Sequence, residues 1–139
     1  MTFNSFCKQL NVKMTRLRQS ILSILWHSSK PLKAYDILEK LKETQENAKP
    51  PTVYRVLDYL VAEGIIHKLP SIQSYTLCCH PNEHHHSADI LMICHDCLNV
   101  TEIHDPIMHA VIEKISSENK FSTKNDSIEI RGLCAKCQP

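Results

Sequence analysis

Two cysteine pairs of identical spacing constrain this chain more than any other feature. They are Cys94-His-Asp-Cys97 and Cys134-Ala-Lys-Cys137. Because two residues separate the thiols of each pair, one tight turn can present both sulfurs to one cation, and two such turns supply the four soft ligands of a closed tetrahedral zinc site. A closed site stabilises structure and leaves no position for chemistry. We therefore predict a structural zinc here, in preference to a redox-active CxxC pair or buried free thiols.

Regular structure must occupy the segment between the pairs, because the gap from Cys97 to Cys134 is too long for a compact zinc ribbon. Apolar patterning predicts strands at residues 90–93, 100–103 and 128–130, and a helix that begins at Asp105-Pro106 and ends before Ser116. The helix is expected to turn five apolar side chains inward: Ile107, Met108, Val111, Ile112 and Ile115. Three strands and one helix cannot bury both faces of a sheet, so this part is expected to pair with a second copy.

Composition places the chain in a reducing compartment and suggests two parts. Seven cysteines without a secretory signal indicate the cytoplasm and metal ligation rather than disulfides, and no apolar segment is long enough to span a membrane. Residues 1–80 carry 11 Lys and Arg against 6 acids, whereas residues 81–139 carry 5 against 9, together with six of the nine histidines. A basic front and an acidic, ligand-rich back indicate different partners, although chance drift in surface charge gives differences of this size.

The front half has the pattern of a winged helix. Helices are expected at residues 4–13, after a Thr15 cap, from Ala34, and after Pro50-Pro51, and Gly64 ends the last of them. Residues 65–69 and 74–78 then predict a β-hairpin. If the loop is residues 70–73, Leu69 pairs with Ser74 and His67 opposes Thr76. Cys78 then lies on the face of His67, within reach of a shared ion, whereas a one-residue slip separates the two.

The fourth helix is the candidate for reading DNA. Its apolar residues occupy one arc, which leaves Tyr54 and Arg55 near the N-terminus outside it. Arginine can bind guanine bidentately, and tyrosine can contact phosphate or a thymine methyl. For this helix alone, the simpler interpretation is that Tyr54 and Arg55 lie on a solvent-exposed face without a function. The predicted winged helix instead favours DNA binding.

The predicted fold class is α+β, with an N-terminal winged-helix DNA-binding domain and a small C-terminal α/β dimerisation domain. The expected boundaries are residues 1–79 for the first domain, 80–87 for a hinge, and 88–139 for the second, which holds the cysteine pairs. The hinge is placed at a Pro-Asn turn without periodicity.

Several motifs in family order resemble the ferric uptake regulator family of bacterial metal-sensing repressors, most closely its zinc uptake regulator branch. They are the run from Ala48 to Asp58, Gly64-Ile65-Ile66-His67-Lys68, Ser74-Tyr75-Thr76-Leu77-Cys78, Ile93-Cys94-His95-Asp96-Cys97 and Gly132-Leu133-Cys134-Ala135-Lys136-Cys137. The resemblance covers nearly the whole chain from Val12. It implies a winged helix, a dimerisation domain, a structural zinc on the four cysteines and a separate sensing zinc, which makes two zinc ions per monomer.

By this resemblance the sensing ligands are His67, Cys78, a histidine upstream of the first cysteine pair, and Glu102. The histidine is one of His84, His85 and His86, with His86 or His85 preferred. His104 or Asp89 would belong to a third, weaker site. The resemblance also implies a DNA contact by Tyr35, and the full set of predicted DNA contacts is Tyr54, Arg55, Tyr35, Thr52 and Arg18.

The sequence thus predicts a zinc-responsive, homodimeric repressor of zinc uptake genes that binds a palindromic operator in double-stranded DNA, with no small-molecule substrate and no enzymatic activity. The alternatives are an iron- or peroxide-responsive sensor of the same family, a zinc buffer that binds no DNA, or a zinc-dependent enzyme. A zinc hydrolase or deaminase requires a catalytic glutamate in a motif such as HExxH, and no such motif occurs. A thioredoxin-like enzyme requires a CxxC that opens a helix, whereas Cys94 is expected between strands.

Overall fold

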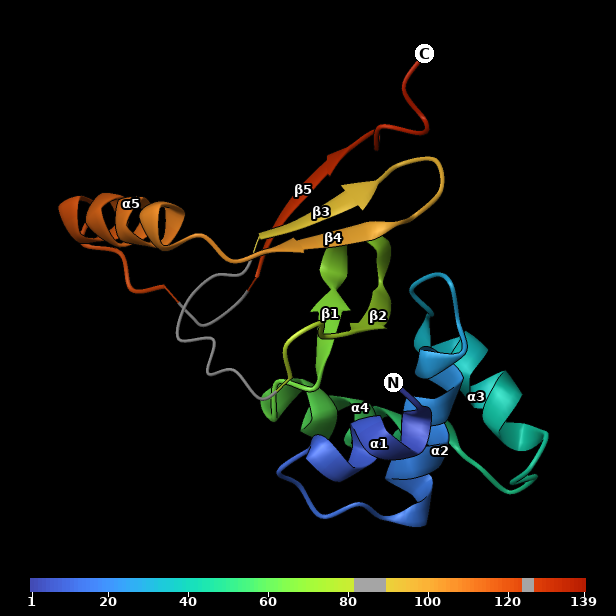
Figure 1. The fold of residues 1–139 in the computed structure, drawn as a ribbon. Coiled ribbons are helices and arrows are strands. Elements are labelled where there is room, and N and C mark those ends of the chain that lie inside the picture. The colour runs from blue at the N-terminus through green and yellow to red at the C-terminus, as the bar shows by residue number, and fades with distance from the viewer. Residues whose placement is uncertain (82–89, 124–126) are drawn as a thin grey trace. The chain divides into compact units, whose positions relative to one another are not determined.

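The computed structural model describes residues 1–81, 90–123 and 127–139, and the chain divides into two compact units, Met1–His84 and His85–Pro139 (Figure 1). Helices dominate the first unit and a small sheet the second, so the predicted α+β class is confirmed. Among the described residues, no helix has the length and apolar character needed to cross a membrane.

Four helices form the base of the first unit: α1 (Phe3–Gln9), α2 (Arg16–Trp26), α3 (Ala34–Lys42) and α4 (Pro50–Ala62). Thr15 caps α2 as predicted, since its side chain accepts a hydrogen bond from the Arg18 N–H at 3.2 Å. Prolines occupy the first turn of α4, where no N–H is needed. The core between these helices is fully buried and is made of aliphatic side chains that recur at helical spacing: Ile21, Leu22, Ile37, Leu41, Leu57 and Leu60.

Helix α1 is shorter than the predicted 4–13. It ends at Gln9, and Leu10 takes an extended conformation with its N–H bonded to the Cys7 carbonyl at 3.3 Å. Leu10 is buried in the core of the first unit. The chain therefore leaves the helix where an apolar side chain gains more from burial than from continuing the helical turn.

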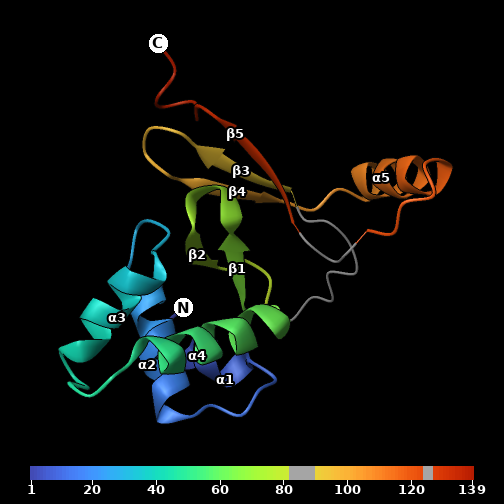
Figure 2. The ribbon, with the colours of Figure 1, turned by 180° about the vertical axis from the view of Figure 1, so that it is seen from behind.

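The wing consists of β1 (Ile66–Leu69), a 3-10 turn η1 (Pro70–Ile72) and β2 (Ser74–Leu77). Its antiparallel register pairs Leu69 with Ser74 and His67 with Thr76, as predicted from the loop length. Gly64 has φ +73°, which suits the turn that ends α4. Leu32 and Tyr75 exchange two backbone hydrogen bonds of 3.0 and 2.8 Å, which tie the wing to the segment before α3. Figure 2 shows the hairpin extending from the end of α4, the arrangement of a winged helix.

The second unit contains β3 (Ile90–Cys94), β4 (Val100–Ile103), α5 (Pro106–Glu118) and β5 (Ile128–Gly132). Its sheet has the order β4-β3-β5, with β4 antiparallel and β5 parallel to β3. The two carboxyl ends of β3 and β5 therefore lie at the same edge of the sheet.

The prediction that α5 turns its apolar residues inward is wrong for a single chain, and the helix also runs past Ser116 to Glu118. Four of the five predicted inward residues are exposed, at 74% for Ile107, 40% for Met108, 41% for Val111 and 53% for Ile115. Periodicity identifies an apolar face but not what covers it. A contiguous exposed face of this kind is typical of a protein interface.

Candidate metal centres and nucleic-acid interface

The sheet of the second unit brings the two cysteine pairs together. Cys94 is the last residue of β3 and pairs with Gly132 at the end of β5. Each strand then enters a short turn that carries its remaining cysteines. Cysteine pairs about forty residues apart in sequence therefore meet at one edge of one sheet because β3 and β5 are parallel.

Backbone hydrogen bonds fix both turns. In the first, the Leu98 N–H donates to the Cys94 carbonyl at 3.0 Å, and Leu98 takes a left-handed conformation with φ +61°. In the second, the Cys137 N–H donates to the Cys134 carbonyl at 3.0 Å. The Cys134 N–H also donates to the Cys94 sulfur at 3.4 Å, which joins the two turns.

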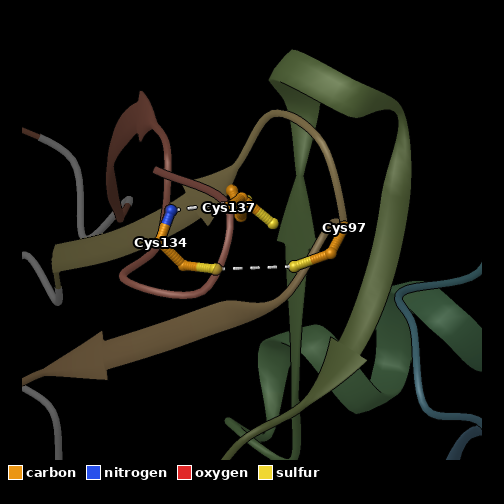
Figure 3. Close-up of side chains that lie close together, drawn as sticks. Cys97, Cys134 and Cys137 are labelled. Atoms are coloured by element: carbon orange, nitrogen blue, oxygen red, sulfur yellow. Dashed lines mark hydrogen bonds between the residues drawn. The ribbon is translucent and has the colours of Figure 1, made fainter. Parts of the chain in front are cut away.

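The four sulfurs have the spacing that a tetrahedral zinc requires. All four lie within 4.8 Å of one another, and Cys97 and Cys134 are 3.8 Å apart. With Zn–S bonds of about 2.3 Å, the edge of an ideal tetrahedron of sulfurs is about 3.8 Å. Figure 3 shows the sulfurs of Cys97, Cys134 and Cys137 pointing into one space. None of the four forms a disulfide, so all are available as ligands.

The four thiols have different surroundings, which shift the pKa values of Cys94 and Cys137 in opposite directions. Backbone N–H groups of Cys134 and Cys97 donate to the Cys94 sulfur and lower its pKa from 9.0 to about 6. Hydrogen bonding with the Cys134 and Cys94 side chains raises the pKa of Cys137 to about 12. Cys94 is therefore the thiolate at neutral pH, whereas Cys137 must lose a proton when a cation binds.

A second candidate pair of ligands lies on the wing. His67 on β1 and Cys78, just beyond β2, offer ligand atoms within 4.8 Å of each other, and both side chains are buried. The Cys78 N–H bonds the Ile65 carbonyl at 2.9 Å, which extends the hairpin ladder and places Cys78 diagonally across from His67. The Cys78 sulfur also accepts a hydrogen bond of 3.4 Å from the His80 N–H.

Of the other predicted sensing residues, Glu102 lies on β4 of the second unit, with its side chain 4% exposed. Its carboxylate oxygen Oε1 is 2.9 Å from Nε2 of His104. Sequence reasoning assigned His104 to a third site and missed this pair, although the two residues are two apart across the end of a strand and so share a face. The predicted ligands His84, His85 and His86, and also Asp89, lie outside the described residues.

The predicted DNA-binding residues lie on α2, α3 and α4. Tyr54 is 50% exposed and Arg55 is also exposed in the first turns of this helix, after the half-buried Thr52. Tyr35 at the start of α3 is 68% exposed. An aromatic side chain with this exposure gains nothing from the core of the described unit, which favours a role in contacting a partner.

Arg18 differs from these residues because it is already held by protein contacts. Its Nη1 donates to the Lys13 carbonyl at 2.8 Å, and its guanidinium lies over the ring of Tyr59. A guanidinium has five N–H donors, so these contacts leave it able to bind a phosphate.

The first unit is thus a winged helix, and the second is a small mixed sheet with a four-cysteine cluster at its edge. Comparison with known sequences agrees with this architecture. The sequence model of the ferric uptake regulator family matches residues 9–131. The chain belongs to the ferric uptake regulator family.

Among relatives, the zinc uptake regulation protein of Escherichia coli (strain K12) is 35% identical over 131 residues, which cover 94% of this chain and 76% of the relative. The ferric uptake regulation protein of Neisseria meningitidis serogroup B is 30% identical over 135 residues, which cover 94% of this chain and 90% of the relative. Relatives named for zinc uptake and for ferric uptake therefore both match this chain.

Two solved structures share the fold along nearly the whole chain. A zinc uptake regulator complexed with zinc and DNA matches with a TM-score of 0.85 at 34% identity, covering 96% of this chain and 89% of that one. The structure of holo XcZur matches with a TM-score of 0.83 at 32% identity, covering 97% and 95%.

Proposed function

We propose that this chain is a zinc-responsive transcriptional repressor that binds a palindromic operator as a homodimer and controls zinc uptake genes. The observation that carries the proposal is the buried His67–Cys78 pair on the wing, because a thiolate beside an imidazole is a zinc-type donor set in the DNA-binding unit itself. The zinc uptake regulator solved with zinc and DNA, which this chain resembles over its length, supports the same function.

Two zinc ions per monomer are proposed, with different roles. Cys94, Cys97, Cys134 and Cys137 would hold a structural zinc, since their sulfur spacing fits a closed tetrahedron. The bound ion would stabilise the second unit by joining the ends of β3 and β5. This assignment also explains why a unit with few buried side chains holds four thiols at one edge.

The sensing site would consist of His67, Cys78, Glu102 and either His86 or His85. These residues come from the wing, from the predicted hinge and from β4. They can share one ion only when both units approach it, so occupancy of the site would couple the DNA-binding unit to the dimerising unit. A shift in that equilibrium from 1:99 to 99:1 requires a differential affinity of about 5.5 kcal/mol.

The proposed DNA contacts follow from the winged helix. Arg55 and Tyr54 at the start of α4 would reach base edges in the major groove, while Thr52, Tyr35 and Arg18 would contact the phosphate backbone. A dimer would place two such helices in major grooves about 34–36 Å apart, which matches a palindromic site. Dimerisation through the exposed apolar face of α5 would bury surface that the single chain leaves in water.

An iron- or peroxide-responsive sensor is the alternative within the family, and the relative from Neisseria meningitidis is named for ferric uptake. Hard cations prefer oxygen and nitrogen ligands, so the sulfur of Cys78 beside His67 favours zinc. A zinc buffer that binds no DNA and a zinc-dependent enzyme are the remaining alternatives. Membership of a family of regulators supports a regulatory role in the cytoplasm rather than a catalytic one.

The test is DNA binding at controlled free zinc. A palindromic duplex selected from a random pool by the zinc-loaded protein would be titrated with the wild-type chain in a zinc buffer and in excess chelator. Tight binding only in the zinc buffer is expected. Equal affinity in both conditions would show that the chain is not zinc-responsive.

Cys78→Ser separates sensing from folding. This variant should keep the structural zinc and the dimer, yet bind the duplex weakly at every zinc concentration. Cys7→Ser is the matched control, because Cys7 is a half-buried thiol of the first unit. It belongs neither to the four-cysteine cluster nor to the His67–Cys78 pair. If Cys78→Ser instead lost the dimer, Cys78 would belong to the structural part of the protein.

A further inference from the structure

Glu102, a proposed sensing ligand, forms an ion pair with His104, a residue that the proposed ligand set does not include. Nε2 of His104 lies 2.9 Å from Oε1 of Glu102, within the range of a charge-assisted hydrogen bond. The carboxylate side chain is 4% exposed and the imidazole 28% exposed. Both residues belong to the second unit.

The local backbone explains why the imidazole reaches this carboxylate. Glu102 is inside β4 and pairs with Leu91 of β3, while His104 follows the last residue of the strand. Residues two apart along extended chain project to the same face, so the side chains of Glu102 and His104 lie side by side. Immediately after His104, Asp105 caps α5 by accepting a hydrogen bond from the Ile107 N–H at 2.8 Å. The strand on one side and the helix cap on the other therefore restrict where His104 can lie.

A hydrogen bond at Oε1 restricts the rotation of the Glu102 carboxylate without preventing ligation. An ionised carboxylate has about four lone-pair sites, and one accepted hydrogen bond uses one of them. Partners of this kind orient a ligand before the ion arrives, which lowers the ordering cost of binding, and their loss typically weakens metal affinity by about 10–100-fold.

We propose that His104 is a positioning residue for Glu102, and that its hydrogen bond to the carboxylate sets the zinc affinity of the sensing site. This inference rests on the proposed function, because it takes Glu102 as a sensing ligand. His104 acts through Glu102 and is not itself a ligand. Under this proposal His104 does not belong to the third, weaker metal site that the sequence predicted for His104 or Asp89.

The chain contains a matched control for this pair. His109 and Glu113 on α5 form another His–Glu contact, with Nε2 and Oε1 3.4 Å apart and side chains 34% and 68% exposed. Their spacing of four residues on a helix surface gives a solvated pair of small energetic value. A change at His109 therefore removes a histidine and a His–Glu contact from the second unit without affecting Glu102.

The experiment compares four single variants, and the double variant of His104→Phe with Glu102→Gln, in the full chain with its structural site already loaded. His104→Phe keeps an aromatic ring but has no donor, His104→Gln keeps an N–H donor, His109→Phe is the control, and Glu102→Gln weakens the ligand itself. Zinc affinity of the second site is measured by competition with a chromophoric chelator. Cobalt(II) is then titrated into the same site, and the thermal midpoint of the protein without the second ion is recorded.

His104→Phe is expected to weaken second-site zinc binding by about 10–100-fold, with His104→Gln recovering most of the loss and His109→Phe unchanged. At saturating cobalt the ligand-field spectrum of His104→Phe should equal that of the wild type, because no ligand is lost. In a Glu102→Gln background, His104→Phe should have little further effect, since both changes remove one interaction. An unchanged thermal midpoint separates this result from a general loss of stability.

Two results would overturn the assignment of His104. Unchanged zinc affinity in His104→Phe, with Glu102→Gln impaired, rejects the inference and leaves the proposed sensing site intact. A changed cobalt spectrum in His104→Phe that His104→Gln does not restore makes His104 a ligand instead. If Glu102→Gln itself has normal zinc affinity, the ligand set of the proposed function is wrong.

Discussion

The guanidinium carbon of Arg18 lies 3.7 Å from the centroid of the Tyr59 ring, and this contact joins α2 to the C-terminal half of α4. The same guanidinium donates to the Lys13 carbonyl at 2.8 Å, so one side chain contacts both helices and the loop that precedes α2. A cation–π contact at a partly exposed position contributes about 0.5–1 kcal/mol. Arg18 therefore both stabilises the winged helix and presents positive charge beside α4.

Arg18→Ala is expected to have two separable effects. Loss of the stacking should lower the free energy of unfolding of the first unit by about 1 kcal/mol. Loss of a phosphate contact should reduce the slope of log affinity against log salt by about one. Tyr59→Leu should reproduce the first effect and leave the salt slope unchanged. If the slope is also unchanged in Arg18→Ala, Arg18 has a structural role only.

Arg55→Ala tests the reading of base edges by α4. Removal of a bidentate contact to a base should cost about 1–3 kcal/mol and relax the preference at one position of each half-site. Lys42→Ala is the control, since it removes an exposed positive charge of the same unit that pairs only with Glu39 on its own helix at 3.5 Å among the contacts described. Binding to duplexes with single substitutions measures the preference. A uniform loss across all substituted duplexes would reassign Arg55 to the backbone.

The acidity of Cys94 gives a pH prediction for the reduced, zinc-free protein. Hydrogen bonds from the Cys134 and Cys97 N–H groups hold the pKa of Cys94 at about 6, below its ordinary value of 9.0. Because the folded state favours the thiolate, the resulting stabilisation is present above pH 9 and is lost as the pH falls through about 6. Thiolate absorbance should therefore show one step near pH 6 that Cys94→Ser abolishes.

Cys137→Ser is the matched control for this titration, because Cys137 has a raised pKa of about 12 and is not one of the backbone donors that lower the pKa of Cys94. The step near pH 6 should persist in this variant. Its disappearance would mean that the low pKa belongs to the four-cysteine cluster as a whole rather than to the backbone donors around Cys94.

The apolar face of α5 predicts the oligomeric state. Ile107 is 74% exposed and Ile115 53% exposed, so replacing both by Glu should convert the dimer to a monomer, as measured by sedimentation equilibrium. The first unit should stay folded, which the fluorescence of Trp26 reports. Lys114→Glu on the same helix should leave the dimer intact, because Lys114 is a solvated residue paired only weakly with Glu118 at 4.0 Å. A persistent dimer in the Ile double variant would place the interface elsewhere.

Local sequence signals predicted the winged helix because each of them acts over a short range. The Thr15 cap, the prolines at the start of α4 and Gly64 at its end fix helix limits by backbone chemistry alone. The wing register followed from the length of one loop, which is why the pairing of His67 with Thr76 was predictable. That register in turn brought His67 and Cys78 into reach of each other.

Other features depend on tertiary partners that no local signal specifies. The parallel pairing of β3 with β5 joins segments separated by a helix, and the spacing of the cysteines indicated only that both pairs must meet. Helix α1 ends early because Leu10 has a place in the core. The apolar stripe of α5 was read as a core face because a sequence pattern does not distinguish burial within one chain from burial against another.

The parallel alignment of β3 and β5 also determines when the cysteine cluster can exist. Cys94 and Cys97 are synthesised before α5, whereas Cys134 and Cys137 follow β5, which is synthesised after α5. A nascent chain that has completed only its first cysteine turn offers a cation two thiols, not four. Closure of the cluster thus waits for β5 to dock beside β3, and capture of the proposed structural zinc would coincide with assembly of the second unit, after β5 has been synthesised.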